Sequence, residues 1–220
     1  MNIKDHTIVT ADSRKVIPGA LFVAVKGFAS DGHDYIASAM EKGATEIICE
    51  HVPEGVTASG NTPVFTMVEN SRRALAEAAD EFYGHPSRKL KLVGITGTNG
   101  KTTTVTLLYR MFMGMGIKCG LLSTIANYVG EERLETENTT ADPLTINSLL
   151  ARMVEEGCEY CFMEVSSIGV EQERVARRFS DLEADLIQGC ELMQGFYFCK
   201  PLPEKEFLKF IEEHRDMGSA

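Results

Sequence analysis

Residues 89–104 read KLKLVGITGTNGKTTT, an apolar run followed by a glycine-rich turn and then by Lys-Thr-Thr-Thr. A strand, a glycine turn and a helix in this order are typical of a loop that cradles phosphate groups, because backbone N–H groups converge at the start of the helix. The usual pattern G-x-x-x-x-G-K-[ST] places its first glycine where this chain has Ile95. The stretch is therefore a variant of the phosphate-binding loop.

The residue types in the loop predict which groups bind ATP. Lys101 is expected to lie along the β- and γ-phosphates and is the candidate catalytic residue, and Thr102 can give its hydroxyl to Mg²⁺. An ordinary strand–turn–helix with a surface lysine is the alternative, but the glycines and the Lys-Thr pair favour the nucleotide. The expected ATP-binding residues are Gly97, Thr98, Asn99, Gly100, Lys101, Thr102 and Thr103.

Hydrophobic patterns on both sides of the loop predict an α/β fold. Helical patterns alternate with apolar runs, which implies a mainly parallel sheet whose ligands sit at the carboxyl ends of its strands. The expected strands are residues 20–26, 45–49, 63–68, 90–96, 117–122 and 160–165. The expected helices lie within residues 33–43, 71–83, 101–113 and 143–156.

Local signals also predict helix ends and a domain boundary. Asn70 and Asp142 are expected N-caps, and Pro143 fits the first helical position. The segment HPSRK at 85–89 is the expected boundary. We expect three parts: an N-terminal α/β domain at 1–88, part of a phosphate-loop α/β domain at 89–178, and a tail at 179–220.

Composition and cysteine usage exclude several classes of function. The chain of 220 residues has a formal net charge of −10 and no Lys/Arg-rich run, which argues against a nucleic-acid partner. No signal peptide and no stretch of about 18 apolar residues is recognisable, so no membrane association and a cytoplasmic location are expected. Cys158 and Cys161 have the spacing of a zinc or redox pair, but without a second pair we expect reduced, buried thiols throughout.

Longer segments resemble the Mur ligase family of peptidoglycan synthesis. The matching segments are TGTNGKTTT at 96–104, ENTTADPL at 137–144 and MEVSSIGVEQERV at 163–175. The segment ADSRKVIPGALFVAVKGFASDGHDYI at 11–36 narrows the resemblance to the MurE group, which adds the third residue of the stem peptide. MurF, MurC and folylpolyglutamate synthetase share the glycine loop, but the Asp-Ser-Arg segment and the Glu-Val-Ser-Ser run argue against the last of these. The resemblance covers about residues 5–178.

The resemblance implies an ATP-dependent ligase with a uridine-binding N-terminal domain and a truncated central domain. Such an enzyme activates the terminal carboxylate of UDP-N-acetylmuramoyl-L-Ala-D-Glu as an acyl phosphate, which the amine of a diamino acid then attacks. The family match implies that Thr102 and Glu164 hold Mg²⁺. Without the family match, Glu164 could also be a solvated carboxylate at a strand end. The substrate-binding residues that the resemblance implies are Ser13, Phe28, Ala29, Ser30, Asn138, Thr139, Thr140, Ser166, Gln172 and Arg174.

Some positions depart from the family pattern, and the resemblance ends after Arg174. Ala141 stands where the family more often has proline, and Ile168 where it often has histidine. The family's Arg-Asp-His motif and its carbamylated lysine do not follow in the remaining sequence. Residues 182–210 instead resemble the last strand and helix of an EAL-type cyclic-di-GMP phosphodiesterase, with chance similarity as the alternative. We therefore expect ligand binding without turnover, either as the N-terminal part of a ligase or as a non-catalytic binding module, and the diamino acid is left open.

Overall fold

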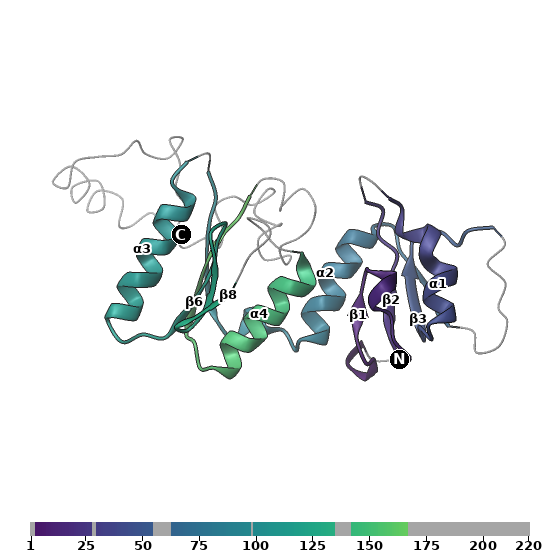
Figure 1. Cartoon of the computed structure of the whole chain (residues 1–220), viewed down its shortest axis with the longest axis horizontal. Coiled ribbons are helices and arrows are strands. Elements are labelled where there is room, and N and C mark those ends of the chain that lie inside the picture. Colours follow the sequence, from purple (N-terminus) through teal and green to yellow (C-terminus); the bar gives the residue numbers. More distant parts are fainter. Residues whose placement is uncertain (1–2, 28–29, 55–62, 98, 135–141, 167–220) are drawn as a thin grey trace, which may run out of the picture.

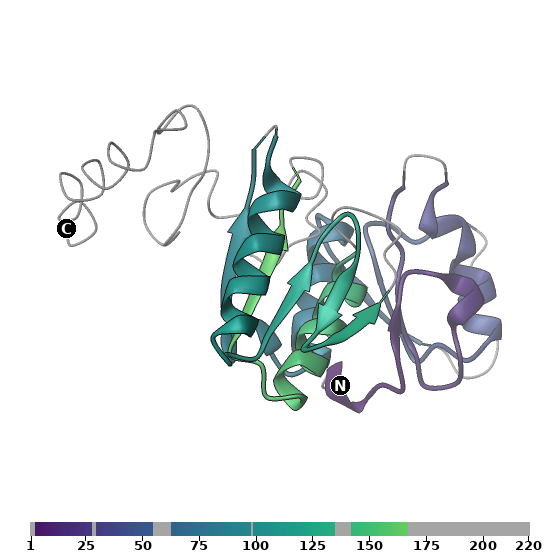
Figure 2. The same ribbon diagram turned by 60° about the vertical axis from the view of Figure 1, so that its left-hand side comes forward.

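The structure is a computed structural model that describes residues 3–27, 30–54, 63–97, 99–134 and 142–166. Two separate β-sheets lie side by side along the molecule, and helices flank each of them (Figures 1 and 2). The first sheet has the strand order β1-β2-β3-β4, and the second has the order β5-β9-β6-β7-β8. The described part of the chain therefore has the α/β fold that the sequence predicts.

The first sheet is parallel throughout and carries one α-helix on each face, besides short 3-10 helices. Its strands are β1 (Val9–Thr10), β2 (Leu21–Val23), β3 (Glu46–Cys49) and β4 (Val64–Met67). Its helices are η1 (Ile3–Asp5), η2 (Ser13–Lys15), η3 (Gly32–Tyr35), α1 (Ile36–Glu41) and α2 (Ser71–Phe82). Alternate residues of a strand face opposite sides: in β2, Phe22 joins the core cluster under α1, whereas Leu21 and Val23 join the cluster under α2.

The second sheet combines a parallel half with an antiparallel hairpin. Its elements are β5 (Lys91–Ile95), α3 (Lys101–Gly114), β6 (Cys119–Leu122), β7 (Asn127–Val129), β8 (Glu132–Leu134), α4 (Pro143–Glu155) and β9 (Tyr160–Glu164). Strands β5, β9 and β6 are parallel, whereas β6, β7 and β8 pair antiparallel. The prediction of a mainly parallel sheet omitted β7 and β8, because strands of three residues are too short to show a regular alternation.

Alternation along β9 decides which side chains meet α3. Phe162 packs in the cluster that contains Val105 and Tyr109 of α3. Cys161 and Met163 point the other way and pack against α4. Glu164 follows Phe162 by two residues, so its side chain lies on the α3 face, at the carboxyl end of the strand.

Local side-chain chemistry fixes the helix ends that the sequence predicts. The Asn70 side chain accepts a hydrogen bond from the backbone N–H of Arg73, and the Asp142 side chain accepts from the N–H groups of Leu144 and Thr145. Helix α2 ends before Gly84, which has φ +74°, and His85 then adopts φ +56°. His85 is held in this left-handed conformation by Asp80, whose carbonyl accepts from its backbone N–H at 2.8 Å.

Helix α4 contacts elements of both sheets' parts of the chain. It packs against α2 (Figure 1), and its Leu144 joins the core cluster of the first sheet. The short helix η4 (Pro86–Arg88) leads from α2 into β5, at the boundary expected from HPSRK. The division into domains at residues 88 and 178 nevertheless stays a prediction. Among the residues that the structure describes, no helix is long and apolar enough to cross a membrane, and a cytoplasmic location stays a prediction.

Candidate functional site

The glycine turn joins the end of β5 to the start of α3. Ile95, which stands where a common phosphate loop has glycine, is the last residue of β5 and is buried against Val105 and Phe162. Gly97 has φ +137° and Gly100, the N-cap of α3, has φ +83°. These backbone conformations favour glycine, because other residues meet steric strain there. The variant loop therefore keeps its glycines where the turn needs them and uses Ile95 for the core.

Lys101 and the helix start face the turn. The Lys101 ammonium donates to the carbonyl of Gly97 at 2.7 Å, so the side chain folds back across the turn. In the part of the loop that is described, no side chain caps the N-terminus of α3. Free N–H groups at a helix start and an adjacent lysine form the arrangement that binds phosphate oxygens. Asn99, Gly100 and Thr103 are exposed beside them, whereas Thr98 lies outside the described residues.

Glu164 is buried, and several donors surround its carboxylate. Only 1% of the residue is exposed. Its Oε2 accepts from the Thr102 hydroxyl at 2.9 Å and from the Thr124 hydroxyl at 3.2 Å, and its Oε1 accepts from the Thr124 backbone N–H at 2.8 Å. The alternative of a solvated carboxylate at a strand end is therefore wrong. Thr124 was not a predicted site residue, because its contact depends on β6 lying beside β9.

The oxygen atoms gathered at this point suit Mg²⁺. A hydroxyl and a carboxylate are hard ligands, and Mg²⁺ is commonly held by one or two protein oxygens together with substrate phosphates and water. Within the described ranges, no group of three or more His, Cys, Asp or Glu side chains could hold a metal ion by itself. Thr102 and Glu164 therefore fit a magnesium ion that arrives with a nucleotide.

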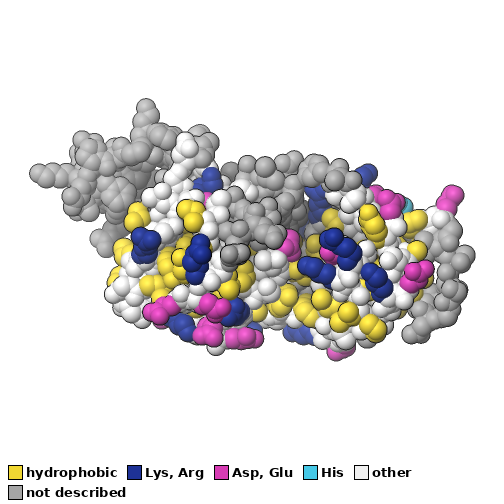
Figure 3. Space-filling view, in the orientation of Figure 1, with side chains coloured by type: hydrophobic (Ala, Val, Ile, Leu, Met, Phe, Trp, Pro, Cys, Tyr) yellow, Lys and Arg dark blue, Asp and Glu magenta, His cyan; other side chains and the backbone are white. Residues whose placement is uncertain are grey.

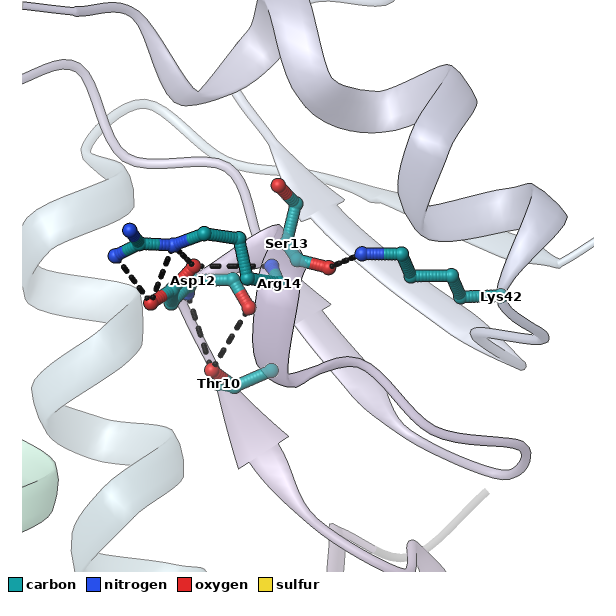
Figure 4. Close-up of polar contacts among 5 residues, drawn as sticks. All are labelled: Thr10, Asp12, Ser13, Arg14 and Lys42. Atoms are coloured by element: carbon teal, nitrogen blue, oxygen red, sulfur yellow. Dashed lines mark hydrogen bonds and ion pairs between the residues drawn. The ribbon is translucent and has the colours of Figure 1, made fainter.

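A second group of predicted residues lies at the end of β1, in the first sheet (Figure 4). Asp12 accepts two bonds from the guanidinium of Arg14, at 2.9 Å from Nε and 2.8 Å from Nη2, and it also accepts from the Arg14 backbone N–H at 2.9 Å. Lys42 donates to the Ser13 carbonyl at 2.8 Å. The Ser13 hydroxyl points away from these contacts (Figure 4). These hydrogen bonds hold the backbone of the turn, and the Ser13 hydroxyl takes no part in those that Figure 4 draws.

Charge around this turn favours an anionic ligand. The side-chain hydrogen bond from Arg14 lowers the pKa of Asp12 to about 2, so Asp12 is a carboxylate at neutral pH. Arg14, Lys15 and Lys42 are exposed at the turn, and Figure 3 shows Lys and Arg side chains gathered over the first sheet on the face in view. These cations offset the chain's acidic net charge locally.

The loop that contains Phe28, Ala29 and Ser30 is closed at its base. Lys26 and Asp31 form an antiparallel bridge, and the Gly27 N–H donates to the Ser30 carbonyl at 3.0 Å. The Arg72 guanidinium of α2 donates to the Lys26 carbonyl at 2.7 Å. Ser30 is exposed at this base, while Phe28 and Ala29 lie outside the described residues.

A buried histidine fixes the same loop to β3. His33 is 2% exposed, and its Nε2 accepts from the Glu50 backbone N–H at 2.9 Å. Its Nδ1 therefore carries the proton and donates to Asp31 Oδ1 at 2.5 Å. The ring stacks on His51 with 4.2 Å between ring centroids. Sequence reasoning missed these contacts, because His33 and Glu50 meet only in the folded chain.

The remaining predicted site residues are divided between described and undescribed parts. Ser166 is half-buried and follows Val165, the first residue after β9, whose N–H donates to the Ile95 carbonyl at 2.9 Å. Asn138, Thr139, Thr140, Gln172 and Arg174 lie outside the described residues. The EAL-like segment at 182–210 also lies outside them, and that resemblance stays a prediction.

The cysteines of the described residues are free and buried, as predicted: Cys49, Cys119, Cys158 and Cys161. Burial raises the pKa of Cys119 to about 11, and it also raises the pKa of Cys158 and Cys161. Protonated thiols are poor nucleophiles and poor metal ligands. The C-x-x-C pair is therefore part of the core, while Cys190 and Cys199 lie outside the described residues.

Comparisons with known proteins connect both groups of residues to one family. A family model described as "Mur ligase family, catalytic domain" matches residues 5–83, and one described as "Mur ligase middle domain" matches residues 95–184. The UDP-N-acetylmuramoyl-L-alanyl-D-glutamate–2,6-diaminopimelate ligase of Parabacteroides distasonis is 55% identical over 172 residues, which are 78% of this chain and 35% of the relative. The ligase of the same name from Bacteroides fragilis is 52% identical over 174 residues, which are 77% of this chain and 34% of the relative.

Solved structures give a similar result. A structure of a UDP-N-acetylmuramoyl-L-alanyl-D-glutamate–2,6-diaminopimelate ligase aligns with a TM-score of 0.60 and 25% identity, over 77% of this chain and 34% of that chain. The MurF ligase of Thermotoga maritima in complex with ADP aligns with a TM-score of 0.50 and 29% identity, over 76% of this chain and 33% of that chain. The chain thus spans about a third of the length of the proteins it matches.

Proposed function

We start from the fact that this chain belongs to the Mur ligase family, and we propose that it supplies the nucleotide site and part of the substrate site of a peptidoglycan ligase. The observation that carries the proposal is the contact between Thr102 and the buried Glu164 beside the glycine turn. A hydroxyl, a buried carboxylate, a lysine and the start of α3 at one end of the sheet suit a nucleoside triphosphate with its metal ion.

The loop residues would bind the phosphates of ATP. Lys101 would leave the Gly97 carbonyl and place its ammonium against phosphate oxygens, which are stronger acceptors because they are charged. Backbone N–H groups from Gly100 to Thr103 would hold the chain of phosphates at the helix start. The alignment with a MurF ligase that binds ADP supports nucleotide use at this loop.

Thr102 and Glu164 would hold Mg²⁺. The Thr102 hydroxyl can offer an oxygen lone pair to the ion while its O–H still donates to Glu164 Oε2. When bound, the ion would neutralise charge on the phosphates and so allow an anionic substrate to approach. Lys101 would add to this neutralisation with its ammonium group.

The first sheet would bind the uridine end of UDP-N-acetylmuramoyl-L-Ala-D-Glu. Ser13 and Ser30 belong to the segments that follow the carboxyl ends of β1 and β2, and ligands of parallel sheets bind outside such ends. The exposed cations at the Asp12–Arg14 turn suit a diphosphate. Residues such as Asn138 and Arg174 would contact the peptide part, and 2,6-diaminopimelate, which the relatives are named for, would be the amino acid that the whole ligase adds.

Calorimetric titration of the 220-residue chain with ATP and Mg²⁺ tests the nucleotide site. Lys101→Ala should weaken ATP binding by about 10- to 100-fold, because a charge-assisted contact is lost. Lys118→Ala is the matched control, since this exposed lysine pairs with Glu156 at the opposite end of the second sheet. Equal ATP affinities in the wild type and Lys101→Ala would refute the assignment.

A further inference from the structure

We propose that Thr124 is a positioning residue of the nucleotide site, which it serves by holding the Glu164 carboxylate in the orientation that meets Thr102. The inference rests on the proposed function. Thr124 belongs to the turn between β6 and β7, and its backbone N–H and its hydroxyl both donate to Glu164, at 2.8 Å and 3.2 Å. No comparison and no sequence motif assigned a role to this residue.

Strand pairing brings the turn to the carboxylate. Leu122 is the last residue of β6 in register with β9, where it faces Met163. The chain then leaves the sheet ladder, so the Thr124 N–H meets the side chain of Glu164. The contact therefore joins the carboxyl ends of two neighbouring strands, at the end of the sheet where the glycine turn also lies.

The turn itself is rigid. The Ser123 hydroxyl donates to the Ala126 carbonyl at 2.7 Å, and the Ser123 backbone N–H donates to Asn127 Oδ1 at 3.2 Å. Ser123, Ala126 and Asn127 are all buried. Thr124 is exposed between them, so its position is set by the buried residues rather than by its own packing.

Holding the carboxylate matters because the orientation of Glu164 decides which of its oxygens meets Thr102. A buried carboxylate is costly unless donors compensate for the water it has lost. Thr102 belongs to the nucleotide loop, so its hydroxyl would share its oxygen with Mg²⁺ during binding. Thr124 supplies donors from outside the loop, which keeps the carboxylate oriented at the same time.

Calorimetric titration with ATP over a series of Mg²⁺ concentrations tests the inference in the full 220-residue chain. Thr124→Val removes the hydroxyl and keeps the shape, and we expect ATP affinity in saturating Mg²⁺ to fall by about three- to tenfold. Affinity for ATP in EDTA should stay unchanged, which a general weakening of the fold would not produce. Thr124→Ser, which keeps both donors, should behave as the wild type.

Two controls separate the possible failures. Thr7→Val removes an exposed hydroxyl that donates to the Pro18 carbonyl at 2.9 Å, near the first sheet. This variant should leave ATP binding unchanged. A double variant Thr102→Val/Thr124→Val should lose less affinity than the two single losses combined, because both hydroxyls act on one carboxylate. If the wild type binds ATP and Thr124→Val binds it equally well in Mg²⁺, the inference alone is overturned. Absence of ATP binding by the wild type overturns the proposed function together with the inference.

Discussion

The Thr102 hydroxyl donates to Glu164 Oε2 across 2.9 Å, and this contact joins the first turn of α3 to the end of β9. Glu164 is the acidic side chain buried beside the glycine turn. Binding of the proposed Mg²⁺ would depend more directly on this carboxylate than on Thr102, which offers a neutral hydroxyl.

Replacement of Glu164 should therefore change the dependence of ATP binding on Mg²⁺. Glu164→Gln removes the charge and turns an amide N–H₂ towards donors, so we expect ATP affinity in Mg²⁺ to fall by at least about tenfold. Glu159→Gln is the control, because Glu159 is exposed and precedes the first residue of β9, at the other end of the strand. Calorimetry at several Mg²⁺ concentrations would contradict the assignment if Glu164→Gln retained the wild-type Mg²⁺ dependence.

Binding at the first sheet should be independent of the glycine loop. Ser13→Ala should weaken binding of UDP by about fivefold, which corresponds to a hydrogen bond of ~1 kcal/mol. NMR titration measures both the affinity and the residues affected, and Lys101→Ala should leave the UDP affinity unchanged. Chemical-shift changes restricted to residues beyond 90 would rule out this placement of the uridine end.

Local chemistry explains what could be predicted from the sequence. Asn70 and Asp142 cap their helices because a short polar side chain reaches the N–H groups of the next residues, whatever the rest of the fold. The glycine turn was predictable for the same reason, since its residue types and spacing lie within one segment. The family resemblance extended these predictions to Ser13 and Glu164.

The contacts that could not be predicted all join distant segments. Thr124 meets Glu164 because β9 lies between β5 and β6, an order that differs from the order along the chain. Glu50 reaches His33 because β3 pairs with β2. The hydrophobic pattern within a single segment does not reveal which strands will be neighbours, because strand order is decided by packing of the whole sheet.

The pairing of Asp12 with Arg14 should be visible in an acid titration. The Arg14 side chain holds the pKa of Asp12 at about 2, below its ordinary value of 3.8. A depressed carboxyl pKa stabilises the fold above the ordinary pKa, and this contribution is lost as the pH falls from about 4 towards 2. Arg14→Gln should raise the pKa of Asp12 towards its ordinary value, as measured from the pH dependence of the carboxyl ¹³C shift. An Asp12 pKa near 4 in the wild type would contradict the pairing.

A larger side chain at Gly120 of β6 should be destabilising. A Cβ at this position would lie 2.3 Å from Sδ of Met153, which is fully buried in α4. Gly120→Ala should therefore lower the free energy of unfolding by about 1–3 kcal/mol, because the buried Met153 side chain has to leave its place against β6. Urea denaturation followed by circular dichroism measures this loss.

Gly114→Ala is the matched control for Gly120→Ala, since a Cβ at Gly114 meets nothing within 4 Å and this glycine ends helix α3. It should leave stability unchanged or raise it by up to about 1 kcal/mol, given the low helix propensity of glycine. Met153→Ala should be destabilising by itself but should relieve the clash, so the double variant Gly120→Ala/Met153→Ala should lose less than the sum of the single losses. An unchanged urea midpoint for Gly120→Ala, or strict additivity in the double variant, would show that α4 does not pack this closely on β6.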